Sequence, residues 1–125
     1  MAEEQSREQT LQQIRVCCDV LDDRKAEELK VLDVMGKSPV TDYMVLATGT
    51  SIPHLRALRN ELEKKMSECD IQIVGEDREV GSGWVVVDAF DFVIHLFTRD
   101  QRDFYRLEAL WKDAEEIDVA EPLSA

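Results

Sequence analysis

Apolar positions along the chain repeat with two different periods, which predict helices and strands. Over residues 10–21 and 52–69 they recur three and four positions apart, which is typical of one buried face of a helix. Ser51 stands where it would cap the second helix. Five short segments are instead dense in branched and aromatic residues, which indicates strands. These segments are 29–35, 43–47, 71–74, 84–87 and 92–97.

The connections between these segments add further expectations. Only a few residues separate the last two strands, so they are expected to pair as an antiparallel hairpin. The polar, glycine-bearing stretch 75–83 predicts an exposed loop. Thr98 and Gln101 fit a capping box that opens a final helix, and the tail after residue 116 is expected to fray.

The predicted order is helix, two strands, helix, three strands, helix. This order predicts an α/β fold in which helices flank a mixed sheet of about five strands. At 125 residues, with 44% hydrophobic against 34% charged side chains, the chain has the size and composition of one globular domain. We therefore predict a single domain over residues 1–125, with an ordered core of about 10–116.

Composition also bears on where the chain works. No apolar run approaches the roughly 20 residues of a membrane-spanning helix, and the acidic residues 1–8 lack the basic start of a signal or transit peptide. Cys17 and Cys18 are neighbours and Cys69 is distant, so they predict neither a disulfide framework nor a zinc site. These features predict a cytoplasmic protein that does not enter a membrane.

The chain is strongly acidic. Its formal net charge of −12, from 27 acidic and 15 basic side chains, repels phosphate backbones at long range. DNA is therefore not expected as a partner, and a basic protein suits the charge better. An acidic surface also serves solubility alone, so charge does not by itself identify the partner.

Three places could carry chemistry, and each has a simpler structural explanation. Residues 48–51 enter the second helix, where backbone amides attract anions, although an ordinary capped turn uses the same residues. Asp88 and Asp91 flank the hairpin turn and would bind a metal if their carboxylates converged, but aspartate is also favoured in turns. His95 lies mid-strand without a nucleophile nearby, which is typical of a packing or interface residue. No catalytic set, metal site or cofactor is predicted.

Aromatic residues suggest where a protein partner would bind. Trp84 follows a glycine-rich loop, and Tyr105 lies beside the apolar stripe of the final helix. Such residues anchor partners because they bury much area at low entropy cost, although Trp84 fits core packing equally well. Arg102 and Glu108 share one helical face with Tyr105, and this face fits either a solvated or a recognition surface.

Six segments, in their order and spacing over residues 10–114, resemble the ribosomal silencing factor (Iojap-related) family. They are Leu32-Asp33-Val34, Thr41-Asp42-Tyr43, Ala47-Thr48-Gly49-Thr50-Ser51, Gly83-Trp84-Val85-Val86-Val87-Asp88, Val93-Ile94-His95-Leu96-Phe97 and Phe104-Tyr105-Arg106-Leu107-Glu108-Ala109-Leu110-Trp111. The resemblance implies a nucleotidyltransferase-like shape without catalytic residues. It also implies binding to the large ribosomal subunit through ribosomal protein L-fourteen, which sterically blocks joining of the small subunit and represses translation.

The resemblance also nominates residues for the partner surface, with Arg102 added because of its helical position. These candidates are Asp42, Trp84, Asp88, His95, Arg102, Tyr105 and Glu108. Two other functions stay open: a nucleotidyltransferase-like enzyme, suggested only by fold analogy, and a dimeric scaffold with another protein partner.

Two positions depart from the family pattern. Asp77 and Phe90 stand where the family usually has glycine. Phe90 cannot adopt a positive φ as cheaply as glycine, so we expect the hairpin to use a longer loop. An exposed Phe90 ring would favour a homodimer of the free protein.

Overall fold

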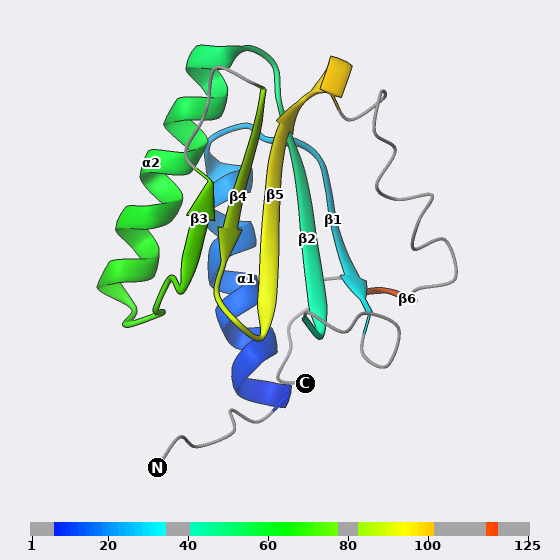
Figure 1. Cartoon of the computed structure of the whole chain (residues 1–125), viewed down its shortest axis with the longest axis vertical. Coiled ribbons are helices and arrows are strands. Elements are labelled where there is room, and N and C mark those ends of the chain that lie inside the picture. The colour runs from blue at the N-terminus through cyan, green and yellow to red at the C-terminus, as the bar shows by residue number, and fades with distance from the viewer. Residues whose placement is uncertain (1–6, 35–40, 78–82, 102–114, 118–125) are drawn as a thin grey trace.

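The computed structural model describes residues 7–34, 41–77, 83–101 and 115–117. The helices and strands of these ranges are α1 (Arg7–Asp23), β1 (Glu27–Asp33), β2 (Tyr43–Gly49), α2 (Ile52–Glu68), β3 (Gly75–Asp77), β4 (Trp84–Asp88), β5 (Phe92–Thr98) and β6 (Glu115–Ile117). The strands form one sheet in the order β3-β4-β5-β2-β1-β6 (Figure 1). Strands β2 and β5 are parallel and the other neighbours are antiparallel, so the predicted α/β fold with a mixed sheet is confirmed.

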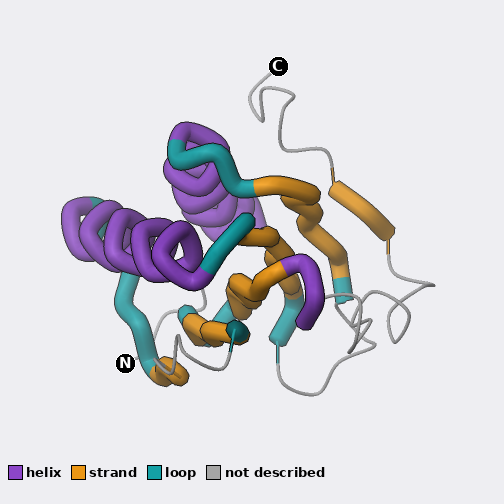
Figure 2. The backbone as a smooth tube through the Cα atoms, turned by 90° about the horizontal axis from the view of Figure 1, so that it is seen from above, coloured by secondary structure: helices purple, strands orange, loops and turns teal. Residues whose placement is uncertain are grey.

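Both described helices pack on the same face of the sheet (Figure 2). Because side chains alternate along a strand, every second residue faces these helices. Val45, Val85 and Ile94 point to this side and join Ile14 of α1 and Leu58 of α2 in the larger core, all with no exposed surface. Neither helix in the described ranges is long and apolar enough to cross a membrane.

A smaller apolar cluster lies on the opposite face, which we call the far face. It is formed by Leu32 of β1, Val34 just after it, Met44 and Leu46 of β2, and Phe97 of β5, with Trp84 of β4 packed against it. The alternating pattern thus gives β2 and β5 two buried faces. That explains why both strands are nearly continuous runs of apolar residues rather than alternating ones.

The cap of α2 follows the prediction. Ser51 has extended backbone, with φ of −159°, and its side chain accepts a hydrogen bond from the backbone N–H of His54 at 3.1 Å. Pro53 lies in the first turn, where its missing N–H costs nothing. The helix ends before Cys69, whose N–H donates to Lys65 O at 3.0 Å.

Two of the three cysteines, Cys17 and Cys18, pack as small apolar residues as predicted, whereas Cys69 does not. Cys17 and Cys18 are buried in the core, and burial raises the pKa of the Cys18 thiol to about 12. Cys69 is exposed, and none of the three forms a disulfide.

The third strand and the loop after it were placed wrongly from sequence. Residues 71–74 form no strand, although Val74 N–H donates to Asp88 O at 2.8 Å. The strand is instead Gly75–Asp77, where Gly75 lies opposite Asp88 and Asp77 opposite Val86. Ile71 contributes to the core from an extended segment, so its apolar character did not require a strand.

The carboxyl-terminal part of the chain differs from the prediction in one respect. Residues 115–117 pair antiparallel with β1 as a sixth strand, with Ile117 opposite Val31, where fraying was expected after residue 116. Three residues carry too little pattern to be recognised as a strand. Helical conformation begins at residues 99–101, and the rest of the predicted final helix lies outside the described residues.

Candidate partner interface

The far face brings together candidate side chains from two neighbouring strands, β4 and β5. Trp84 and Asp88 lie on β4 four residues apart, and His95 lies on β5 between them in register. Trp84 is opposite Phe97, Val86 is opposite His95, and Asp88 is opposite Val93. Trp84, Asp88 and His95 are each half-buried.

Trp84, His95 and Phe97 form one aromatic cluster at one end of this face. The indole Nε1–H of Trp84 donates to Nδ1 of His95 at 3.0 Å. Their ring centroids are 5.8 Å apart, and the Phe97 ring lies 5.7 Å from Trp84 and 6.4 Å from His95. Each ring therefore limits the rotamers of the other two, which makes the cluster rigid.

The protonation state of His95 follows from this geometry. Because Nδ1 accepts the indole hydrogen, the neutral ring carries its own proton on Nε2. Burial also lowers the pKa of His95 to about 4, because the protonated ring would be a cation that little water can reach and hydrate. At neutral pH the imidazole is uncharged and has one N–H to donate.

The acidic candidates lie at the opposite end of the far face. Asp88 Oδ1 accepts a hydrogen bond from Phe90 N–H at 2.8 Å, so this carboxylate shapes the hairpin turn. Asp42 is half-buried just before β2, and its N–H donates to Asp91 O at 3.3 Å. Among the described residues, no group of three or more His, Cys, Asp or Glu side chains could hold a metal ion.

The structure thus places four of the seven candidate residues. Trp84 and His95 are in contact, while Asp88 and Asp42 lie near the hairpin turn. The other three lie outside the described residues: Arg102, Tyr105 and Glu108. Sequence reasoning missed Phe97 as part of this cluster, although its position two residues after His95 on one strand put both on the same face.

The expected longer loop between β4 and β5 is not present. Ala89 N–H donates to Phe92 O at 2.9 Å and Asp91 N–H donates to Ala89 O at 2.9 Å, so the turn is tight. Phe90 itself adopts the positive φ, at 74°. The hydrogen bond from its N–H to Asp88 helps hold this conformation, and the Phe90 ring is exposed as expected.

The loop before α2 is a capped turn, the simpler of its two explanations. Thr50 N–H donates to Nδ1 of His54 at 2.9 Å, and Ser51 caps the helix. Nε2 of His54 donates to Arg24 O at 2.7 Å, which joins this turn to the end of α1. Beside it is a hollow of about 520 Å³, where the Arg99 guanidinium is paired with Glu27.

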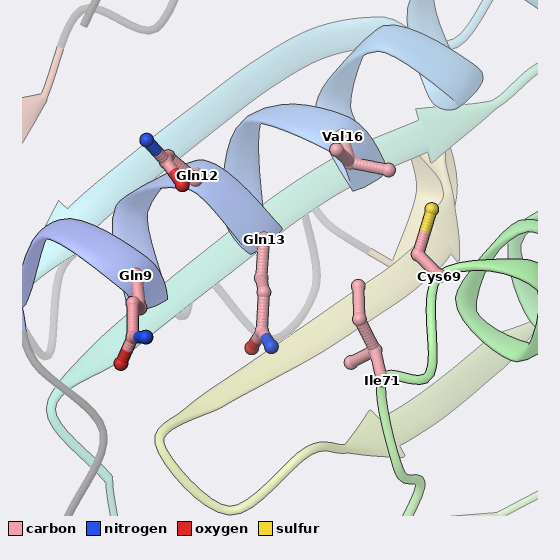
Figure 3. A pocket seen from close by; sticks show the side chains of 6 residues that line it. All are labelled: Gln9, Gln12, Gln13, Val16, Cys69 and Ile71. Carbon is pink, nitrogen blue, oxygen red and sulfur yellow. The ribbon is translucent and has the colours of Figure 1, made fainter.

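One pocket could not be foreseen from sequence. It has a volume of about 300 Å³ and lies between α1 and the segment after α2 (Figure 3). Gln9, Gln13 and Val16 line it from α1, opposite Cys69 and Ile71. Its two walls are far apart in sequence, so no local pattern predicts it.

Comparison with known proteins identifies the family. A family model described as "Ribosomal silencing factor during starvation" matches residues 7–125. This chain belongs to the ribosomal silencing factor family. The ribosomal silencing factor RsfS of Bacillus subtilis (strain 168) is 34% identical over 106 residues, which cover 85% of this chain and 90% of that protein.

A eukaryotic relative and a solved structure are also similar to this ribosomal silencing factor. The mouse protein named "Mitochondrial assembly of ribosomal large subunit protein 1" is 34% identical over 104 residues, which cover 78% of this chain and 44% of the mouse protein. A crystal structure of a Chromobacterium violaceum protein matches with a TM-score of 0.77 at 30% identity, covering 90% of this chain and 93% of that one. The ribosomal silencing factor fold is therefore shared in three dimensions as well as in sequence.

Proposed function

We propose that this protein represses translation by binding the large ribosomal subunit through ribosomal protein L-fourteen, which sterically blocks joining of the small subunit. The proposal rests on the match of residues 7–125 to the ribosomal silencing factor family. The name of the mouse relative, which refers to the large ribosomal subunit, supports the choice of subunit. The protein acts as one cytoplasmic domain and performs no catalysis.

The far face supplies features that suit such binding. Its aromatic cluster is held by the hydrogen bond from Trp84 to His95, so little conformational entropy is lost when a partner covers it. In the complex, the neutral His95 donates its Nε2–H to an acceptor on the partner. Asp42 and Asp88 add negative charge toward a basic ribosomal protein.

A sedimentation experiment tests the proposal directly. The purified protein is expected to co-sediment with isolated large subunits and to reduce their association with added small subunits. A protein that ignores large subunits, or that turns over a nucleotide at a bound divalent metal, contradicts it.

Two substitutions at Trp84 separate the indole N–H from the ring. Trp84→Ala removes both and is expected to weaken binding to large subunits by about tenfold or more, as loss of a buried aromatic anchor does. Trp84→Phe keeps a ring over Phe97 but leaves Nδ1 of His95 without its donor, so it is expected to weaken binding less. Circular dichroism checks that both variants are folded.

A charge reversal tests the helical candidates. Glu108→Lys is expected to weaken co-sedimentation, because it replaces an acidic side chain on the proposed surface with a basic one. If folded Glu108→Lys and Trp84→Ala both bind as the unmodified protein does, neither residue belongs to the interface.

A further inference from the structure

Phe90 is an unusual residue for its position. The residue is 70% exposed, and its backbone φ is 74°. A bulky side chain rarely adopts positive φ, and glycine would do so without strain. The ring gains little burial in return, so neither the backbone nor the core explains a phenylalanine at this position.

The turn presents this ring on a well-held backbone. The N–H of Phe90 is fixed by Asp88 Oδ1, and the N–H of Asp91 closes onto Ala89 O across Phe90, which makes a γ-turn. The hydroxyl of Thr41 lies 3.4 Å from Phe90 O. In Figure 1 the turn between β4 and β5 lies at the lower end of the sheet, beside the start of β2.

A second exposed apolar residue lies close to this turn. Val74 is 54% exposed, and its N–H donates to the carbonyl oxygen of Asp88, the residue whose side chain binds Phe90 N–H. Val74 and Phe90 therefore both donate a backbone hydrogen bond to Asp88, one to its carbonyl oxygen and one to its carboxylate. They are the large hydrophobic residues that are exposed in the described part of the chain.

Three acidic residues lie at or beside this turn: Asp42, Asp88 and Asp91. Asp88 lies between the two exposed apolar residues, and Asp91 follows Phe90 and accepts the N–H of Asp42 on its carbonyl oxygen. A second copy of this chain would bring the same carboxylates against one another, which opposes association. A basic surface that contains an apolar depression fits both the ring and the charges.

We propose that Phe90, with Val74 beside it, anchors this hairpin turn in an apolar depression on a basic protein, and that Asp42, Asp88 and Asp91 pair with cations at its rim. The inference rests on the proposed function, since the basic partner is then a protein of the large ribosomal subunit. It extends the interface from the aromatic cluster of the far face to the tip of the hairpin.

Phe90→Gly tests the proposal because it changes stability and binding in opposite directions. Glycine removes the strain of the positive φ, so the thermal unfolding midpoint is expected to rise by about 3 °C. Loss of the ring is expected to reduce the affinity for isolated large subunits about tenfold, measured by co-sedimentation over a range of protein concentrations. Phe90→Tyr keeps the ring and is the matched control, with affinity expected within about twofold of the unmodified protein.

The other outcomes are equally decisive. If Phe90→Gly is more stable and binds large subunits as tightly as the unmodified protein, the inference is wrong while the proposed function stands. If Phe90→Gly converts a free dimer into monomers with unchanged subunit affinity, the ring contacts a second copy and the inference is also wrong. If the unmodified protein itself fails to bind large subunits, the proposed function is wrong, and so is the inference that rests on it.

Discussion

His95 remains a neutral imidazole inside an apolar sheet because Trp84 supplies its hydrogen bond. Without that bond, Nδ1 would be a half-buried acceptor with no donor, which costs free energy on folding. The neighbouring Phe97 ring further excludes water from the imidazole. The same surroundings that make the neutral ring acceptable make its protonated form unfavourable.

This burial predicts a loss of stability in mild acid. In the unfolded chain His95 binds a proton near its ordinary pKa of 6.5, whereas in the folded chain it does so only near pH 4. The contribution is therefore complete above pH 6.5 and is lost as the pH falls toward 4, up to about 3 kcal/mol. Urea unfolding of the unmodified protein and of His95→Gln at pH 7.5 and pH 5 measures it, because glutamine does not titrate. An equal loss of stability in both proteins would contradict this role.

At the scale of the elements, the side chain of His54 in α2 forms hydrogen bonds with the turn before this helix and with the segment after α1. Its Nδ1 accepts the Thr50 N–H at the entry to α2, and its Nε2 donates to Arg24 O just after α1. The two described helices are thereby tied together at one end by a single side chain. Arg24 adds a second link through its ion pair with Glu61 of α2, 2.9 Å long.

Removal of the His54 side chain is expected to destabilise the fold. His54→Ala deletes both hydrogen bonds, which lie at exposed positions where water partly replaces them, so the expected cost is about 1 kcal/mol. Arg56→Ala is the control, because Arg56 is an exposed residue of the same helix and its loss is expected to change stability by less than about 0.5 kcal/mol. Guanidinium unfolding compares the two. Equal stability of both variants would mean that water replaces the His54 bonds.

Elements with a strong local period could be predicted, and those that depend on a distant partner could not. The apolar stripes of α1 and α2 and the apolar runs of β2, β4 and β5 are each recognisable from their own residues. In contrast, β6 exists because β1 offers an edge, and β3 is set by its register with Asp88 rather than by its own residues. The candidate site follows the same division: alternation indicates the face of His95, but only the hairpin register shows that Trp84 is its partner.

For the whole molecule, charge and shape lead to one kind of partner. The net charge of −12 disfavours ribosomal RNA and favours a basic protein on the same particle. In the proposed complex, the apolar ring of Phe90 and the aromatic cluster of the far face would supply affinity, and the carboxylates would supply orientation. The proposed steric block would need no chemistry beyond these contacts.

The salt dependence of binding separates these contributions. In the proposed complex with isolated ribosomal protein L-fourteen, salt would screen the attraction of this acidic chain, so affinity is expected to fall several-fold between about 0.05 M and about 0.5 M salt. With intact large subunits the fall is expected to be smaller, because salt also screens the repulsion from ribosomal RNA. Asp42→Asn is expected to flatten the dependence for the isolated protein, whereas Glu68→Gln, an exposed change on α2, leaves it nearly unchanged. Titrations by fluorescence anisotropy measure all three proteins. If affinity for the isolated partner does not depend on salt, the acidic charge of this chain has no part in docking, and apolar contacts alone hold the complex.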